Sequence, residues 1–185
     1  THTMRYIATA ENFGVARVIG LGNKVDIEES EALEYLAGDP ETRAIFIYLE
    51  SFKKPRRFLE VAQTVSQKKP VFLLKGGSTA EGAKAAVAHT AAMAAEDRIT
   101  GAMLHQVGIT RLYQYSHLFL AAKGLASMPL PRSNRVSFLA PSGAMLVCLT
   151  DYCLSLGLKV PDFTDPTRKF LQDISPSIIR MRNPI

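Results

Sequence analysis

Two short apolar runs separated by a helical pattern constrain the fold of this chain more than any other feature. The first run is AIFIYL, Ala44–Leu49, and the second, Val71–Leu74, lies between Pro70 and a pair of glycines. Between them, Pro55 opens a segment with apolar residues at helical spacing, and proline suits the first position of a helix. Short runs of this kind are typical of strands buried on both faces. The pattern therefore predicts a strand–helix–strand unit with parallel strands.

The same alternation of apolar runs and helical patterns continues on both sides of this unit. It predicts an α/β fold in which helices cover both faces of a parallel sheet, doubly wound in the flavodoxin-like manner. Further strands are expected at Val15–Leu21 and Ile109–Leu112. Further helices are expected at Met4–Phe13, Ser30–Ala37, Arg98–Val107 and Ser116–Leu125.

A proline-rich stretch at residues 129–133 predicts a linker between two units. The chain of 185 residues is long enough for one domain, residues 1–128, and a part of another, residues 134–185. In the second unit, strands are expected at Val136–Ala140 and Leu158–Val160, and helices at Ala144–Leu156 and Asp165–Ile174. Two incomplete sheets would favour self-association into homo-oligomers or exchange of segments between copies.

Composition and charge exclude several classes of function. The net charge is +5, but no cluster of base-stacking aromatic residues accompanies the dense basic run Lys53–Arg57, so no nucleic-acid partner is expected. The run is interpreted as a solvated helix start, with an anion-binding surface as the alternative. No apolar run approaches the roughly 20 residues that span a bilayer, so no membrane partner is expected. No metal-ligand cluster is present in the sequence.

The two cysteines of the chain indicate the redox state of its cellular compartment. Cys148 and Cys153 have a spacing that fits neither a zinc site nor a redox pair, and both fall in an apolar helical pattern. They are expected to be core thiols of a cytoplasmic protein in a reducing setting.

Three polar or glycine-rich features follow predicted strands and predict a binding site. They are the turn Gly20–Asn23, the carboxylate of Glu50, and the turn Gly76–Ser78. Right-handed crossovers bring the carboxyl ends of parallel strands to one edge of the sheet. Glycines at such turns allow backbone N–H groups to approach an anion closely. The residues expected to bind phosphate here are Gly22, Asn23, Gly76, Gly77 and Ser78.

His89 follows the third turn closely enough to return to the same edge. A carboxylate such as Glu50 could accept one ring N–H of His89, fix its tautomer and leave the other nitrogen as a nucleophile for a phosphoryl group. On the residues alone, two plainer interpretations stay open: His89 as a surface histidine without a role, and Glu50 as a solvated carboxylate at a strand end.

Several segments, taken in order, resemble one known family. They are GLGNKVD (20–26), EYLAGDPETRAIFIYLES (34–51), RRFLEVAQ (56–63), KKPVFLLKGGSTAEGAKAAVAHT (68–90) and HQVGITR (105–111). The family is the NDP-forming acyl-CoA synthetases, including ADP-forming acetyl-CoA synthetase and, more distantly, the alpha subunit of succinyl-CoA synthetase. FLAPSGA (138–144) and the terminal NPI resemble the next domain of the same proteins more loosely.

The resemblance implies a phosphohistidine enzyme with a succinyl-CoA-synthetase-like fold. In the family, acyl-CoA and phosphate give an acyl phosphate, and the phosphoryl group passes through a histidine to ADP or GDP. His89 matches that histidine, Glu50 matches the glutamate that hydrogen-bonds it, and Thr90 is the next residue of the same segment. The implied cofactors are CoA and ADP/ATP or GDP/GTP with Mg²⁺, none of them held tightly by this chain alone. The implied partners are a CoA-binding domain and an ATP-grasp domain or subunit.

The sequence also departs from the family in two ways. The family's SHTGSLAG segment is AHTAAMAA here, with Ala91 and Ala95 where glycines are expected. The first strand and a Gln-Ser-Gly turn would fall before Thr1, and nothing resembles the CoA-binding or ATP-grasp domains. We therefore expect a fragment that does not complete turnover by itself. The alternatives are a non-catalytic sensor of acyl-CoA or nucleotide with the same fold, for example fused to an acetyltransferase, and a flavodoxin-like binder unrelated to CoA.

Overall fold

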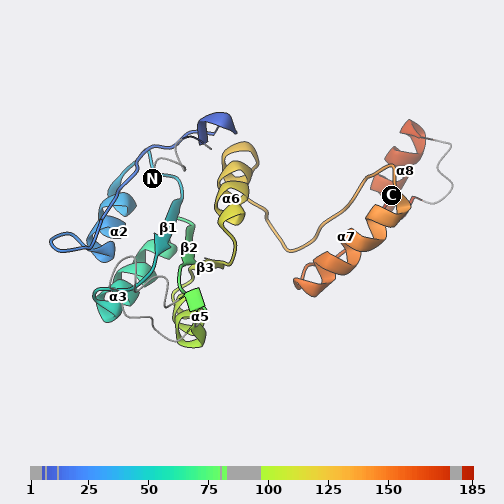
Figure 1. Ribbon diagram of the computed structural model, residues 1–185. Helices are drawn as coiled ribbons and strands as arrows, with labels where there is room; N and C mark the ends of the chain where they lie inside the picture. The colour runs from blue at the N-terminus through green and yellow to red at the C-terminus, as the bar shows by residue number, and fades with distance from the viewer. Residues whose placement is uncertain (1–5, 7, 12, 80, 83–96, 176–180) are drawn as a thin grey trace. The chain divides into compact units, whose positions relative to one another are not determined.

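The structure is a computed structural model that describes residues 6, 8–11, 13–79, 81–82, 97–175 and 181–185 (Figure 1). By the contacts between its residues, the chain divides into two units, Thr1–Pro129 and Leu130–Ile185, and each is described by itself. Among the described residues, no helix combines the length and the apolar character that crossing a membrane requires.

The first unit is built around a parallel sheet. Its described strands are β1 (Ile45–Leu49), β2 (Val71–Lys75) and β3 (Thr110–Leu112), in that order across the sheet. β1 pairs with β2 in parallel from Ile45 opposite Val71, and β2 pairs with β3 in parallel from Phe72 opposite Thr110. The helix α3 (Pro55–Ser66) connects β1 to β2, with proline in its first turn. The predicted α/β fold with parallel strands is confirmed.

Helices lie on both faces of this sheet (Figure 1). α2 (Glu29–Gly38), α3 and α5 (Asp97–Gln106) cover one face, where Leu33, Phe58 and Leu104 join β1 and β2 in one buried cluster. α6 (Tyr115–Ser127) covers the other face, where its Leu118 packs with Leu74 and Leu112 in a second cluster. The strands can feed both clusters because successive side chains of a strand point to opposite faces.

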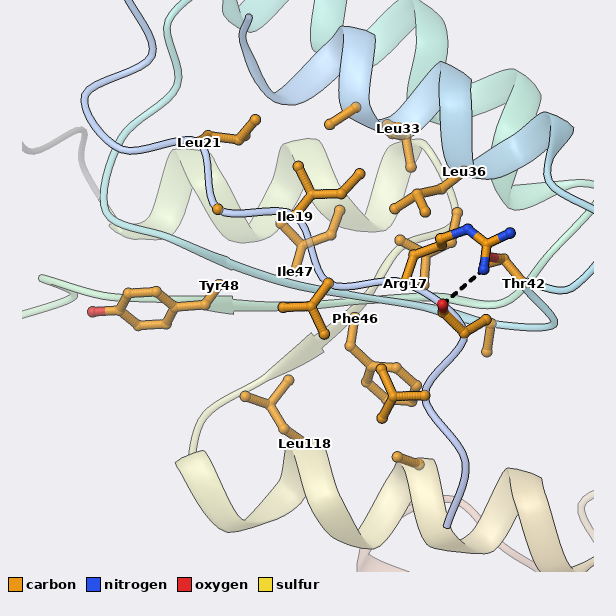
Figure 2. A pocket seen from close by; sticks show the side chains of 18 of the residues that line it. Arg17, Ile19, Leu21, Leu33, Leu36, Thr42, Phe46, Ile47, Tyr48 and Leu118 are labelled. Carbon is orange, nitrogen blue, oxygen red and sulfur yellow. Dashed lines mark hydrogen bonds between the residues drawn. The ribbon is translucent and has the colours of Figure 1, made fainter. Parts of the chain in front are cut away.

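The strand predicted at Val15–Leu21 is wrong. The segment has no helix or strand structure, and no backbone ladder joins it to β1 within the described part of the chain. A strand needs a neighbour about 4.8 Å away to form such a ladder. Here residues of both segments line one groove, and Figure 2 shows Ile19 and Ile47 among them. The segment is apolar as predicted, but no described strand forms backbone hydrogen bonds with it.

The second unit contains α7 (Gly143–Ser155) and α8 (Asp165–Ile174), close to the predicted helices. The strands predicted at Val136–Ala140 and Leu158–Val160 are reduced to a single parallel bridge between Arg135 and Lys159. Instead of a ladder, the side chain of Asn183 donates to the carbonyls of Val136, at 2.9 Å, and Pro161, at 2.8 Å. Backbone hydrogen bonds also join Val136 to Lys159, and Phe138 and Ala140 to Ile185. Two short strands on their own are marginal, and the side chain of Asn183 adds to this limited backbone pairing.

The prediction of two core thiols is wrong for one of them. Cys153 is buried, whereas Cys148 is exposed. The two residues are five positions apart on α7, and at 3.6 residues per turn they point in directions about 140° apart. A single helix face cannot bury both.

Candidate functional site

The carboxylate of Glu50 lies where β1 ends and close to the end of β2. The hydroxyl of Tyr48 donates a hydrogen bond to Oε1 of Glu50 at 3.2 Å. The backbone N–H of Gly76 donates to the carbonyl of Leu49 at 2.8 Å, which draws the turn after β2 against the end of β1. Glu50 is itself half-buried. It is thus held at the rim of the sheet, where a partner can reach it.

Gly76 is glycine for a steric reason that the structure makes plain. A Cβ atom at this position would lie 2.7 Å from the hydroxyl of Tyr48 and 3.2 Å from Cγ of Glu50. Contacts under 3.0 Å are not tolerated without movement, and the Tyr48 hydroxyl that donates to Glu50 would have to move. The absence of a side chain at Gly76 therefore leaves room for the Tyr48 hydroxyl in its position beside Glu50.

The two other predicted glycines occupy turns that favour glycine. Gly77 has a φ of +69° and Gly22 a φ of +54°, the left-handed region that residues with a Cβ adopt at a cost. Ser78 follows Gly77 and is exposed, as is Asn23 next to Gly22. Both turns present backbone groups and small polar side chains to solvent, as a phosphate site requires.

Lys24 ties the first of these turns to the end of β1. Its Nζ donates to the carbonyl of Ser51 at 2.5 Å and forms an ion pair with Glu29 at 3.0 Å. The turn at Gly22 and Asn23 is thereby anchored beside Glu50 and Ser51. Gly76 lies beside Glu50, Lys24 connects the turn at Gly22 and Asn23 to Ser51, and Gly77 and Ser78 follow Gly76 in the chain. His89 and Thr90 lie outside the described residues.

Lys75, the last residue of β2, is a charged residue at this rim that sequence reasoning missed. Only 6% of it is exposed, and its Nζ donates to the carbonyl of Gly76 at 2.5 Å. Burial lowers the pKa of Lys75; the carboxylates of Asp97 and Glu50 act in the opposite direction, and the cations Arg111 and Lys24 lower it further. The sequence does contain a signal for this burial. Lys75 stands directly after the apolar run Val71–Leu74, and the two-residue period of a strand places it on the same face as Val71 and Leu73.

We expect Lys75→Met to stabilise the protein by about 1 kcal/mol at pH 7, because replacing a desolvated charge by an apolar side chain of similar length is often stabilising. The folded chain holds the Lys75 proton less tightly than the unfolded chain does. Wild-type stability therefore rises with pH between the lowered pKa and the ordinary value of 10.5, and the gap to the variant narrows there. Urea unfolding of both proteins at pH 7 and pH 10 measures this gap. A variant less stable than wild type at both pH values would contradict the expectation.

Within the basic run at Lys53–Arg57, the side chain of Arg57 supports the fold, whereas those of Lys53, Lys54 and Arg56 are exposed. Arg57 lies 3.5 Å from Glu28, 3.8 Å from Glu31 and 3.4 Å from Glu34. The backbone N–H of Lys53 donates to Glu29 at 2.5 Å. The basic start of α3 is thus drawn to the acidic start of α2, and Arg57 has its charge met by carboxylates. In the part of the chain that the structure describes, no group of three potential ligands could hold a metal ion.

What the described rim offers chemically is an oriented carboxylate, two turns with exposed backbone groups and one buried ammonium. A carboxylate in this position can accept an N–H and fix the tautomer of an imidazole. The turns and the ammonium of Lys75 favour the binding of an anion. The described rim therefore combines groups that suit an anion with a carboxylate that can orient a partner group.

Known proteins resemble this chain in sequence and in structure. Residues 1–125 match the family described as the succinyl-CoA ligase like flavodoxin domain. The alpha subunit of acetate–CoA ligase [ADP-forming] I from Pyrococcus furiosus is 37% identical over 166 residues, which cover 90% of this chain and 36% of the relative. Acetate–CoA ligase [ADP-forming] from Methanocaldococcus jannaschii is 36% identical over 179 residues, covering 97% of this chain and 25% of the relative.

A solved structure also resembles the chain. It is the dinucleotide-forming acetyl-coenzyme A synthetase 1 of Candidatus Korarchaeum cryptofilum in complex with phosphate and ADP, with a TM-score of 0.91 and 29% identity. The match covers 99% of this chain and 40% of that one. This chain therefore spans between a quarter and two fifths of the length of these relatives.

Proposed function

Because the chain belongs to the NDP-forming acyl-CoA synthetases, through a succinyl-CoA ligase-like flavodoxin domain, we propose that it carries the phosphoryl group in an acid–CoA ligase. The reaction interconverts acyl-CoA, phosphate and a nucleoside diphosphate with the free acid, CoA and the nucleoside triphosphate. A nitrogen of His89 takes the phosphoryl group from an acyl phosphate as the acid leaves. The same group then passes to the nucleoside diphosphate, which restores the neutral imidazole.

One observation carries this proposal: the oriented carboxylate of Glu50 lies beside turns that suit an anion. In the proposed site, Glu50 accepts a hydrogen bond from one ring N–H of His89 and leaves the other nitrogen free to attack phosphorus. Backbone groups at Gly22, Gly76 and Gly77, with the polar side chains of Asn23, Ser78 and Thr90, surround the transferred group. The ammonium of Lys75 offsets part of its negative charge.

The remaining parts of the reaction belong to other segments or subunits. We propose that a CoA-binding domain supplies the acyl-CoA and that an ATP-grasp domain or subunit brings the nucleotide with Mg²⁺. The relatives' extra length leaves room for such parts. The chain by itself would then accept a phosphoryl group without completing turnover, in a cytoplasmic setting.

The test is the chemistry of the phosphorylated residue. The longest natural form of the protein that contains this chain is incubated with radiolabelled ATP and Mg²⁺, and the label is located by mass spectrometry. We expect an acid-labile, base-stable phosphate on the peptide that contains His89, removed when ADP is added. His105 and His117, which lie on α5 and α6, serve as internal controls. Absence of label, or label on a hydroxyl side chain, would contradict the proposal.

A second candidate function is favoured by Ala91 and Ala95, which stand where the family's segment has glycines. A crowded phosphate loop would suit a non-catalytic sensor of acyl-CoA or nucleotide. In that case acyl-CoA raises the melting temperature of the intact protein while no phosphohistidine forms. Turnover of the intact protein at an ordinary rate for a ligase would rule this candidate out.

A further inference from the structure

Arg111 on β3 is a buried charged residue that the proposed reaction does not use. Its side chain is only 10% exposed. Nη1 donates to the backbone carbonyl of Asp97 at 3.1 Å, and Nη2 donates to the carboxylate oxygen Oδ1 of the same residue. Asp97 is the first residue of α5. One guanidinium group thus holds both the main chain and the side chain of the residue at which α5 begins.

The surroundings of Arg111 keep its guanidinium group in one position. Arg111 is paired with Leu73 of β2, on the sheet face that α5 covers. The ring centre of Tyr113 lies 4.8 Å from Cζ of Arg111. On α5, a Cβ atom at Gly101 would lie 3.0 Å from Nη1. Glycine inside a helix is less favourable than alanine, and here it leaves the space that the guanidinium group occupies.

Stability alone explains this ion pair poorly. Nε of Arg111 is buried and has no hydrogen-bond partner in the part of the chain that the structure describes. A buried donor without a partner is costly, and a buried ion pair is often no more stabilising than apolar side chains of similar volume. What an arginine supplies when it makes two hydrogen bonds to one residue is a defined geometry.

The residue that Arg111 holds stands at one end of the segment that contains His89. Asp97 is the first described residue after His89 in the chain, and β2 ends at Lys75 before it. Burial lowers the pKa of Lys75, and among the charges that act on this pKa the carboxylate of Asp97 has the largest effect, in the opposite direction. Asp97 therefore interacts with both Arg111 and Lys75, and it connects the start of α5 to the end of β2.

We propose that Arg111 is a positioning residue. By holding Asp97 against the sheet, it fixes one end of the segment that carries His89 and so directs the imidazole toward the carboxylate of Glu50. Its effect on phosphoryl transfer rests on the proposed function, and Arg111 acts through Asp97 without touching the reacting atoms. A fixed end matters because a displacement of about 1 Å in a reacting group can slow a reaction by about 100-fold.

A disulfide cross-link tests the position of residue 89 without any phosphoryl chemistry. Glu50→Cys and His89→Cys are introduced together into the longest natural form of the protein. The background is Cys148→Ser, because Cys148 is exposed and could form other disulfides. The rate of disulfide formation between positions 50 and 89 under a mild oxidant is followed by mass spectrometry. Adding Arg111→Met should slow this rate by about 10-fold or more, because one end of the segment is released.

Two control variants separate positioning from general loss of stability. Arg98→Met removes an exposed arginine of α5 and should leave the disulfide rate unchanged. Val65→Ala removes buried volume at the end of α3 that leads into β2, so it should lower the melting temperature and also leave the disulfide rate unchanged. Equal slowing by Val65→Ala and Arg111→Met would show that Arg111 acts only through stability, and it would overturn the inference.

The phosphorylation rate then tests the role in the reaction, in proteins that keep Glu50 and His89. Arg111→Met and Asp97→Asn should each lower the maximum rate of labelling from ATP by about 10-fold or more, and the double variant should lower it no further, because the two residues act as a pair. The ATP concentration that gives half the maximum rate should stay unchanged, because the proposed nucleotide site belongs to another domain or subunit.

The two experiments distinguish failure of this inference from failure of the proposed function. Wild-type rates of cross-linking and labelling in Arg111→Met would overturn the inference and leave the proposed function standing. A cross-link that depends on Arg111, in a protein that forms no phosphohistidine, would support the positioning of residue 89 and refute phosphoryl transfer. Absence of the cross-link with Arg111 in place would contradict the inference, because residue 89 would not face residue 50.

Discussion

Phe58→Ala is expected to lower the free energy of unfolding by about 3–5 kcal/mol, the range for truncating a large aromatic side chain in a core. Phe58 is fully buried, and its ring lies 4.9 Å from that of Phe52. It belongs to the cluster that joins α2, α3 and α5 to β1 and β2. A cavity here would loosen every element on that face at once. The loss is a large share of the 5–15 kcal/mol by which domains are usually stable.

Urea unfolding followed by circular dichroism measures this loss. Gln63→Ala is the matched control, because Gln63 lies on the same helix but is exposed, and its truncation should change stability by about 0.5 kcal/mol or less. If Phe58→Ala cost no more than this control, the ring would not be the centre of the core. Phe58→Leu, which keeps part of the volume, should fall between the two.

The second large effect concerns the chemistry. We expect Glu50→Gln to slow phosphorylation of the intact protein by at least ~100-fold, because losing the carboxylate that orients a reactive imidazole is costly in other enzymes. Glutamine has the same shape but presents an amide where the carboxylate accepts the ring N–H, and it carries no charge to stabilise the imidazolium. His89→Asn should abolish labelling altogether and sets the baseline.

Two controls show whether the effect is local. Glu60→Gln removes an exposed carboxylate on α3 and should leave the rate unchanged. Tyr48→Phe removes the hydroxyl that donates to Glu50, and it should slow the rate less than Glu50→Gln does. The melting temperature of Glu50→Gln should stay close to that of wild type, since the side chain lies at the rim. Labelling of Glu50→Gln at the wild-type rate would remove Glu50 from the mechanism.

The order of the regular elements was predictable because the signals are local. The runs at Ala44–Leu49 and Val71–Leu74 became β1 and β2 within one residue at each end. Pro55 marks the start of α3, and Asp165 and Ile174 bound α8 as predicted. The segment at Val15–Leu21 had an equally good apolar pattern and yet formed no strand. An apolar pattern indicates that a segment can form a strand, but a strand also requires an adjacent strand for its backbone hydrogen bonds.

In the candidate site, too, local sequence signals predicted the general position of the residues but not their contacts. Glycine turns after strands predicted that Gly22, Glu50 and Gly76 would share one edge of the sheet, because parallel strands with crossovers align their carboxyl ends. Which atoms meet there could not be predicted. The contact of Gly76 with Tyr48 and Glu50, and the tie from Lys24 to Ser51, depend on residues far apart in the chain.

The sequence by itself determined the helices α2, α3, α7 and α8 and the strands β1 and β2 in their order, since these follow from periodicity and turn residues over short stretches. Only the tertiary structure decided that Lys75 is buried, that Arg57 is matched by carboxylates at and next to α2, and that a groove opens beside β1. The burial of a side chain and its ion pairs depend on residues that are close in space but distant in the sequence. These contacts are fixed only when all the helices and strands pack together.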